Sequence, residues 1–298
     1  MEDKKHPLVH VLLASDSATS AGLAVAGYSA IKQTSAGVAL WVIQQGLDAE
    51  TISSLRKFWS DAAEVNFLTM KYLPWWWATE TLPLLSWARI QAGELLPPRV
   101  PRCIYLDTDT LVGRDLAELW DTPLHGNSIA MAINDKMPEH VITYVQALGI
   151  DPNRWFNAGV ALIDVDAWRR NSEMDALIRC KRSMPPVLWF ADQDLLNKHF
   201  AGRITMLDPS WNRRDVVYPP EGQILHFAGA TKPWQMSGDL GQPGLRAWRE
   251  VYAQWGRPSG PKQRHKIKMR AASAVRRLYS LVRSLPRVTP AQRKTFGL

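Results

Sequence analysis

The sequence predicts an α/β protein whose open, parallel β-sheet is of the doubly wound type, followed by a basic tail. Over roughly the first 110 residues, short apolar runs bounded by turn residues alternate with segments of helical apolar spacing. Beyond residue 256, basic residues are frequent and acidic residues do not occur. We therefore expect one globular unit at 1–256, whose two halves meet near residue 112, and a separate segment at 257–298.

The elements of the first half follow from local patterns. An apolar run predicts a strand at 8–14, and a stretch of small residues predicts a helix at 20–33. Asp48 is a suitable N-cap for the next helix. Apolar spacing predicts a helix at 82–95, which Pro97 and Pro98 end. Further strands are expected at 38–43, 64–68 and 103–106.

The second half is expected to continue with strands and helices. Strands are predicted at 128–133, 160–163 and 224–227, and helices at 192–200 and 245–255. The segment Phe156-Asn157-Ala158-Gly159 leads into the strand at 160–163. The turn-rich stretch 257–261 reads as a linker to the tail.

Composition narrows the class of protein. The chain has 298 residues, of which 46% are hydrophobic, and this is enough to bury a large core. No apolar run approaches the roughly 18 residues that a bilayer-spanning helix requires. The net charge of +8 is unevenly distributed, because 257–298 holds twelve Lys or Arg and no Asp or Glu. The rest of the chain is mildly acidic, so an anionic partner is expected for the tail alone.

Two aspartates follow the strand expected at 103–106. Asp107 and Asp109 are two positions apart, so in an extended segment their side chains point to the same side. Ligands of open α/β sheets bind at the carboxyl ends of strands. A hard cation held by two carboxylates keeps coordination sites for phosphate oxygens. Taken alone, such a pair is also common in surface turns.

Four further segments accompany this pair in a fixed order. They are Ala14-Ser15-Asp16, Phe156-Asn157-Ala158-Gly159, Asp192-Gln193-Asp194, and His226 followed by Gly229 and Lys232-Pro233-Trp234. Together with Asp107-Thr108-Asp109, the set resembles glycosyltransferase family 8 over residues 8–235. Within this family of glycogenin-like retaining transferases, it is most similar to the bacterial lipopolysaccharide galactosyl- and glucosyltransferases. The resemblance implies a Rossmann-like sheet of the GT-A type, which binds nucleotide sugars.

The resemblance implies a metal site made of Asp107, Asp109 and His226. Carboxylates with an imidazole suit Mn²⁺ better than Mg²⁺, although Mg²⁺ stays an alternative. Lys232 would give the diphosphate a positive charge, and Gly229 would let the backbone approach a phosphate. Without the resemblance, His226 would read as a hydrogen-bonded core histidine and Lys232 as a solvated lysine.

The resemblance also assigns substrate contacts. Family members often carry Asn and Tyr soon after the aspartate that corresponds to Asp16, where this chain has Ala18 and Thr19. Either another ring stacks on the base here, or nucleotide affinity is lower. For Asp16, the alternative to a substrate contact is a turn residue or helix cap. For Arg89, the alternative is an ion pair on a helix surface. The substrate-binding candidates are Ala14, Asp16, Arg89, Asp107, Thr108, Asn157, Ala158, Gly229 and Lys232.

The catalytic candidates are Asp192, Gln193 and Asp194. Asp192 can accept hydrogen bonds from sugar hydroxyls, and Gln193 would lie near the anomeric carbon. Because glutamine is a poor nucleophile, the resemblance implies front-face attack through a short-lived oxocarbenium pair. Asp194 becomes a nucleophile only if the site rearranges. The alternative for both acids is the acidic first turn of a helix.

Two segments suggest contacts beyond the donor site. Three adjacent tryptophans at 75–77 cannot all face one core, so at least one is expected at the surface, with a buried hairpin as the alternative. In the tail, apolar residues recur at spacings of three and four between 267 and 285. This pattern predicts a basic amphipathic helix on an anionic membrane surface. No nucleic-acid-binding motif accompanies the charge, so no nucleic acid partner is expected.

These inferences predict a retaining transferase that moves galactose or glucose from UDP-galactose or UDP-glucose to a saccharide. The expected acceptor is lipopolysaccharide core or another membrane-associated glycan, at the cytoplasmic face of a membrane. Asp107 and Asp109 also match the Asp-x-Asp-x-Thr loop of haloacid-dehalogenase-type phosphatases, in which the motif lies on the first strand. A second alternative is a non-catalytic sugar-binding or membrane-adaptor protein.

Overall fold

The computed structural model describes residues 8–71, 73, 77, 84–134, 137–229, 231–236 and 241–256. Two features that the sequence singles out fall outside this part of the chain: Trp75 with Trp76, and the basic segment 257–298. Trp77 is described and is buried, with its ring 4.8 Å from that of Trp87.

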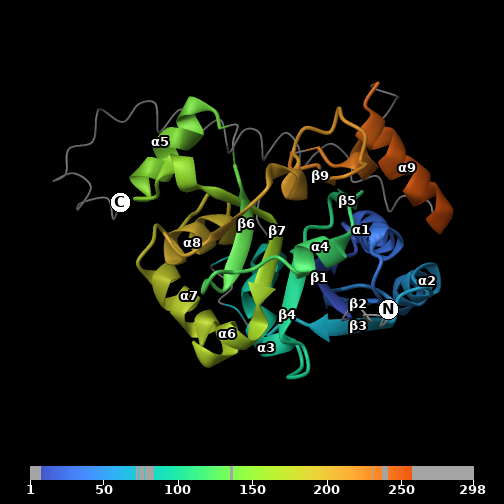
Figure 1. Cartoon of the computed structure of the whole chain (residues 1–298), viewed down its shortest axis with the longest axis horizontal. Helices are drawn as coiled ribbons and strands as arrows, with labels where there is room; N and C mark the ends of the chain where they lie inside the picture. Colours follow the sequence, from blue (N-terminus) through green and yellow to red (C-terminus); the bar gives the residue numbers. More distant parts are fainter. Residues whose placement is uncertain are drawn as a thin grey trace, which may run out of the picture.

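A seven-stranded sheet forms the centre of the molecule, in the order β3-β2-β1-β4-β7-β6-β8 (Figure 1). Strands β1, β2, β3 and β4 are mutually parallel, as the sequence predicts, and β6 is parallel to β8. β1 and β2 are mostly apolar and buried, as expected for strands covered on both faces. The strands are β1 (Val9–Asp16), β2 (Val38–Gln45), β3 (Glu64–Thr69), β4 (Arg102–Leu106), β6 (Ile129–Ile133), β7 (Phe156–Asp164) and β8 (Thr205–Leu207).

The direction of β7 is what assembles the site. β7 is antiparallel to both of its neighbours, β4 and β6, so the sheet is mixed rather than wholly parallel. The start of β7 therefore lies at the same edge as the end of β4. There the Asp107 amide donates to the Gly159 carbonyl at 2.8 Å. Two motifs separated by about fifty positions in the sequence are side by side as a result.

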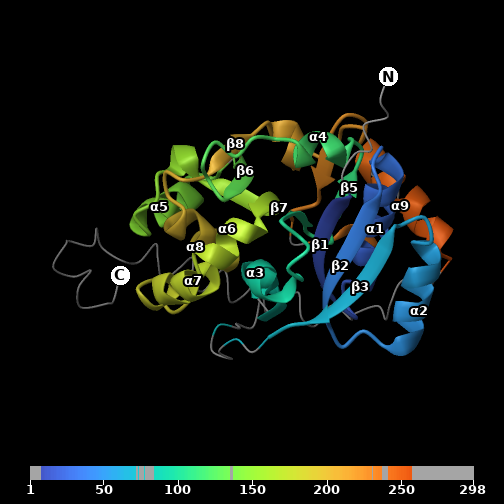
Figure 2. The same cartoon turned by 60° about the horizontal axis from the view of Figure 1, so that its bottom comes forward.

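Helices cover both faces of the sheet, and side chains of β1 alternate between two cores. Val11 and Leu13 face one core with α1, α2 and α4, whereas Leu12 faces the other with α3, α6, α7 and α8 (Figures 1 and 2). The helices are α1 (Ser20–Gln33), α2 (Ala49–Phe58), α3 (Ala92–Leu95), α4 (Leu116–Trp120), α5 (Glu139–Ala147), α6 (Val165–Arg170), α7 (Glu173–Arg182) and α8 (Asp192–His199).

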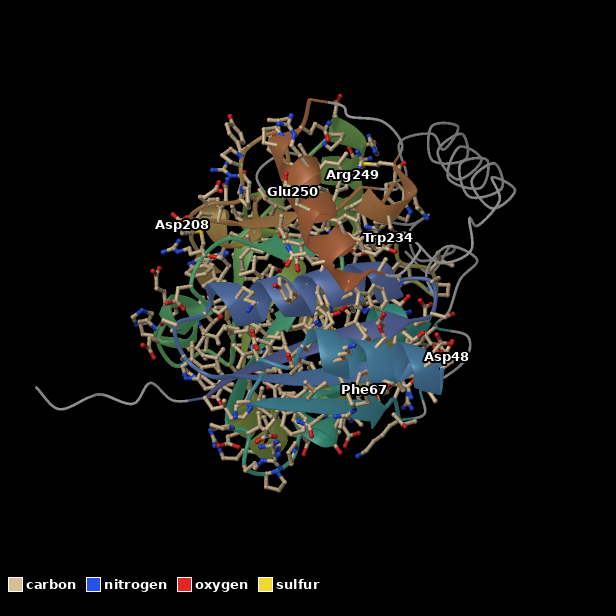
Figure 3. The ribbon with its side chains drawn as sticks, turned by 90° about the vertical axis from the view of Figure 1, so that its right-hand side faces the viewer. Asp48, Phe67, Asp208, Trp234, Arg249 and Glu250 are labelled. Atoms are coloured by element: carbon tan, nitrogen blue, oxygen red, sulfur yellow. The ribbon has the colours of Figure 1, made fainter. Side chains whose placement is uncertain are left out.

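A smaller layer closes the carboxyl edge of the sheet. β5 (Thr110–Val112) and β9 (Ile224–His226) form an antiparallel pair. Helix α9 (Pro243–Trp255) packs Leu245 and Trp248 against Ala21 and Val25 of α1. Figure 3 shows α9 lying over α1, with Trp234 at its side. Short 3₁₀ turns complete the fold: η2 (Leu84–Gln91), η3 (Pro152–Arg154), η4 (Pro209–Asn212) and η5 (Pro233–Gln235).

Local signals for helix ends are confirmed, and one helix type differs from expectation. The Asp48 carboxylate caps α2 by accepting from the Thr51 amide at 2.6 Å. The helix expected at 82–95 is instead the 3₁₀ turn η2 followed by the single-turn α3, which ends before Pro97. Almost all of η2 is buried, so tertiary contacts rather than helical periodicity decide its geometry. Within the described residues, no helix has the length and apolarity needed to cross a bilayer.

Candidate active site

Asp107 is the first residue after β4, and its two carboxylate oxygens have different surroundings. Oδ1 accepts hydrogen bonds from Arg89 Nη2 at 2.9 Å and from the Tyr105 hydroxyl at 3.1 Å. Oδ2 lies 3.6 Å from Nε2 of His226. The side chain is 28% exposed, so this carboxylate is accessible from solvent.

The two carboxylate oxygens of Asp109 also have different surroundings. Oδ1 lies 3.3 Å from His226 Nε2, and Oδ2 forms an ion pair with Lys232. Burial opposes ionisation of Asp109, but His226 and Lys232 outweigh it and hold the pKa of this carboxyl well below its usual range. Asp109 is therefore a carboxylate at neutral pH.

His226 is the last residue of β9, and a glycine below it makes room for its ring. A Cβ on Gly159 of β7 would overlap the imidazole, so the ring lies directly on the β7 backbone. The ligand atoms of Asp107, Asp109 and His226 all lie within 4.8 Å of one another. Two carboxylates and one imidazole form a donor set that fits Mn²⁺ or a similar divalent ion, and three ligands leave positions for phosphate oxygens.

Asn212 belongs to this site, although sequence analysis gave no signal for it. It ends the turn η4, is 6% exposed, and its Oδ1 lies 2.8 Å from His226 Nδ1. Its Nδ2 lies 2.8 Å from Oδ1 of Asn157 and 3.3 Å from the Asn157 carbonyl. An asparagine close after Asp208-Pro209 reads from sequence as an ordinary turn residue.

Arg89 joins the acidic pair to the segment at 192–194. Its guanidinium pairs with Asp107 and Asp192, donates to the Ala158 carbonyl, and lies 4.0 Å from the centre of the Tyr105 ring. Burial alone would lower the pKa of Arg89, but Asp107 and Asp192 raise it above its ordinary value, so the group stays charged. Arg89 is thus not the surface ion pair that its sequence context allows. Its contact with a donor stays a prediction.

Asp192 and Gln193 begin helix α8 next to the start of β7. Asp192 is 4% exposed, and burial raises its pKa to about 7 against the opposing effect of Arg89. Oε1 of Gln193 accepts from the Ala158 amide at 3.3 Å. Ala191, which precedes them, has φ 47° and ψ −120°, a backbone conformation that non-glycine residues rarely adopt. After this strained turn, Gln193 lies against Ala158 and Asp192 pairs with Arg89.

Asp194 has partners of a different kind. It is fully buried, and its Oδ2 accepts from the Tyr144 hydroxyl at 2.6 Å and from the Phe190 amide at 2.9 Å. These contacts hold the first turn of α8 to α5. They agree with the helix-turn alternative, and the role of nucleophile after a rearrangement stays a prediction.

The remaining candidates lie in turns at the same edge of the sheet. Asp16 ends β1, and its Oδ1 accepts from both the amide and the hydroxyl of Thr19 at 3.0 Å, within the turn that leads to α1. Ala14 lies two residues earlier on the same strand and is half-buried. The Thr108 carbonyl approaches Gly22 so closely that a Cβ there would not fit. Gly229 is exposed and follows His226 by three positions.

A family model described as "Glycosyl transferase family 8" matches residues 10–238, which is most of the chain. The chain belongs to glycosyl transferase family 8. The site described above lies within the matched region, and the protein is a glycosyltransferase. This match, and the position of the acidic pair after the fourth strand of the sheet, do not favour the phosphatase alternative.

Relatives and solved structures agree with this membership. A Haemophilus influenzae protein named as a candidate glycosyltransferase is 23% identical over 76% of this chain and 73% of its own length. Galacturonosyltransferase-like protein 9 of Arabidopsis thaliana is 28% identical over 50% of this chain, which covers 44% of the plant protein. This chain therefore matches less than half of that relative.

Family 8 membership also agrees with the fold. The crystal structure of galactosyltransferase LgtC in complex with donor and acceptor sugar analogs has a TM-score of 0.67 at 22% identity. The comparison covers 82% of this chain and 95% of LgtC. The glycosyltransferase GlyE of Streptococcus pneumoniae gives a TM-score of 0.64 at 20% identity, over 83% of this chain and 62% of GlyE. These likenesses establish a GT-A-type fold.

Proposed function

We propose that this family 8 protein transfers galactose or glucose from a UDP-sugar to a saccharide acceptor, with retention of the anomeric configuration and dependence on Mn²⁺. The observation that carries the proposal is the convergence of Asp107, Asp109 and His226 beside Lys232. The structure of LgtC in complex with donor and acceptor sugar analogs supports a sugar donor and a saccharide acceptor on this fold.

The diphosphate side of the donor would lie against the acidic pair. Asp107, Asp109 and His226 would hold a divalent ion, which when bound neutralises charge on the departing diphosphate. Lys232 is 32% exposed and lies against Asp109, so its ammonium can reach a phosphate oxygen from the same side. Arg89 keeps Asp107 in place from the opposite side.

The sugar would lie against Asp192, Gln193 and Asn157. The Asp192 carboxylate, paired with Arg89, can accept hydrogen bonds from sugar hydroxyls. Gln193 has its oxygen bound to the Ala158 amide, so its amide nitrogen is the group left for the substrate. A covalent intermediate would need a free carboxylate, whereas Asp192 is paired and Asp194 is bound to Tyr144. These contacts favour front-face attack, in which the leaving phosphate oxygen takes the proton of the acceptor hydroxyl.

The acceptor and the place of action belong to the same proposal. We infer that the acceptor is a membrane-associated saccharide such as lipopolysaccharide core, and that the protein acts on the cytoplasmic side as a peripheral membrane enzyme. The support comes from the sequence of 257–298, whose twelve basic residues and apolar repeat suit an anionic bilayer surface.

Hydrolysis of a panel of UDP-sugars tests this function without knowledge of the acceptor. We expect slow release of UDP from UDP-galactose or UDP-glucose with Mn²⁺, loss of release after EDTA treatment, and recovery when Mn²⁺ is added back. Proton NMR of a product formed on a model saccharide should show the α-anomer. No turnover of any UDP-sugar would favour the non-catalytic alternative, and a β-linked product would exclude retention.

A further inference from the structure

A chain of hydrogen bonds connects the metal side of the site to the sugar side. It runs from His226 through Asn212 to Asn157 and ends at the Gly159 amide, with contacts of 2.8, 2.8 and 2.9 Å. The three side chains are at most 8% exposed, so water does not compete for these contacts. Each member of this chain is held by its neighbours.

The orientation of both amides follows from one backbone group. The Gly159 N–H can only donate, so the Asn157 atom 2.9 Å away must be the oxygen. The Asn212 atom facing that oxygen at 2.8 Å must then be its NH₂ group, which also points at the Asn157 carbonyl. The other end of the Asn212 amide is therefore an oxygen, and it faces His226.

The same argument determines which ring nitrogen of His226 carries a proton. Because Asn212 Oδ1 can only accept, His226 Nδ1 must carry a proton to satisfy the contact of 2.8 Å. In the neutral ring, the lone pair then lies on Nε2. This atom is the one that is 3.3 Å from Asp109 and 3.6 Å from Asp107.

We propose that Asn212 is a positioning residue that holds His226 in the Nδ1-protonated tautomer, so that Nε2 is offered to a metal ion between the two aspartates. Metal-bound histidines usually have such a partner on the second nitrogen, and its loss typically lowers metal affinity 10- to 100-fold. The inference deepens the proposed function, because it assumes a metal at Asp107, Asp109 and His226.

Asn212 also determines what Asn157 can offer to a substrate. The Asn157 oxygen already accepts from two donors, the Gly159 amide and Asn212. Its NH₂ group is left, so Asn157 can donate to a hydroxyl or phosphate oxygen but does not accept from a hydroxyl proton. One residue thus sets the ligand atom of the histidine and the polarity of the sugar-facing asparagine.

Two substitutions separate these effects. Asn212→Leu removes both contacts, and we expect Mn²⁺ affinity of the nucleotide-free protein to fall about 10- to 100-fold. Asn212→Asp keeps an acceptor for His226 but cannot donate to Asn157. We expect it to retain most of the Mn²⁺ affinity and to raise the KM for the UDP-sugar. Asn127→Leu is the control, because Asn127 lies just before β6 and donates to Thr205 at the start of β8.

Free Mn²⁺ measured by electron paramagnetic resonance gives these affinities, and circular dichroism shows whether each variant is folded. Equal Mn²⁺ affinity of the parent protein and a folded Asn212→Leu variant would overturn the positioning role. If the parent protein itself binds no Mn²⁺, the proposed function is wrong, and this result is distinct from a failure of Asn212.

A second measurement needs no variant of Asn212. The ¹⁵N spectrum of histidine-labelled, metal-free protein reports whether Nδ1 of each ring carries a proton, and His226→Gln identifies the signals. We expect a protonated Nδ1, because Asn212 Oδ1 can only accept. The opposite tautomer would contradict the proposal, even if Asn212→Leu fails to fold.

Discussion

At the residue scale, the repulsion between the carboxylates of Asp107 and Asp109 is offset by basic partners. Two carboxylates close together repel, and leaving either one buried without a partner would be costly. Here Arg89 binds one oxygen of Asp107, and Lys232 binds one oxygen of Asp109. The other oxygens face His226. The ligand atoms are thus arranged by protein groups alone.

Asp109→Asn tests the metal assignment most directly. The amide presents a weaker ligand, so we expect Mn²⁺ affinity and metal-dependent UDP-sugar turnover to fall by more than about 100-fold. Titration calorimetry with Mn²⁺ and a coupled UDP assay measure both. Asp61→Asn is the control, since Asp61 is exposed and pairs with Lys32. Near-normal turnover of a folded Asp109→Asn variant at saturating Mn²⁺ would rule out this ligand role.

Gln193→Ala should affect the chemical step more than binding. The Gln193 oxygen is held by the Ala158 amide, and in the proposed function its NH₂ group donates to the substrate, where negative charge develops on the leaving phosphate oxygen in the transition state. We therefore expect kcat to fall by more than KM rises. Steady-state kinetics with the best UDP-sugar measure the split, and Gln146→Ala on the exposed face of α5 is the control. A rise in KM alone would assign Gln193 to ground-state binding.

At the element scale, local patterns were sufficient for most strands and for helix ends. The sequence predicts β1 to β4 and the cap of α2, because apolar runs and a capping aspartate act over short distances. It does not predict the reversal of β7, the 3₁₀ geometry of η2 or the role of Asn212. Each of these depends on residues outside its own segment: β7 on β4, η2 on the core around it, and Asn212 on His226.

The candidate site shows the same division. The residues of the ordered motifs were predicted, and Asp107, Asp109 and His226 do come together. The sequence could not show that Arg89 bridges Asp107 and Asp192, because the three residues come from η2, the end of β4 and the start of α8. Nor could it show that Asp194 binds Tyr144 whereas Asp192 pairs with Arg89, since Tyr144 lies on α5.

Strand β7 must carry glycine where the His226 ring lies against its backbone. A Cβ at Gly159 would overlap the His226 ring, so Gly159→Ala should displace the ring and lower Mn²⁺ affinity. Overpacking of this kind should also lower the free energy of unfolding by about 1–3 kcal/mol. Urea unfolding and Mn²⁺ titration measure both effects. The control is Gly93→Ala, whose Cβ would make ordinary contacts at 3.5 Å or more. Unchanged Mn²⁺ affinity would show that the ring tolerates a shift.

The first turn of α8 should make stability depend on pH through Asp194. Burial raises the pKa of this carboxyl from its ordinary value of 3.8 to about 7 in the folded protein, while Tyr144 and two amides act in the opposite direction. The native state then binds more protons than the unfolded state between these values. Its contribution to stability is complete below pH 4 and is lost as pH rises through 7.

Asp194→Asn should therefore remove one source of this pH dependence. Between pH 4 and 7, the free energy of unfolding of the parent protein should fall relative to that of the variant, by at most about 1.4 kcal/mol per pH unit. Urea unfolding across this range gives both curves. Parallel curves would show that Asp194 is ionised throughout, and a steeper fall in the variant would reverse the assigned direction.

At the scale of the whole molecule, the candidate active site and the basic segment occupy different parts of the chain. The site residues all precede residue 233, and α9 then packs on α1 before the described residues end at Gly256. Figure 3 shows Trp234, which follows Lys232 by two positions in the sequence, at the side of α9. The Arg249 side chain donates to the Met236 carbonyl at 3.0 Å and further ties α9 to this loop. Chemistry should thus require α9 but not residues 257–298.

Deletion of 257–298 should release the protein from anionic vesicles while leaving soluble UDP-sugar turnover nearly unchanged. The segment holds twelve positive charges and no negative ones, and each basic residue near an anionic leaflet contributes about 1 kcal/mol. This part of the attachment should weaken with salt, because salt screens charges at the surface. The apolar repeat between 267 and 285 should add a part that salt does not remove.

Co-sedimentation at low and high salt separates the two contributions. A variant with Leu278→Ser, Leu281→Ser and Leu285→Ser keeps every positive charge and loses the three leucines of the apolar repeat. We expect it to bind anionic vesicles at low salt and to be released completely at high salt, whereas the parent protein is released only in part. Equal binding by parent and truncated proteins, or a preference for neutral vesicles, would contradict membrane attachment through this segment. A truncated protein that cannot fold would show instead that 257–298 is part of the core structure.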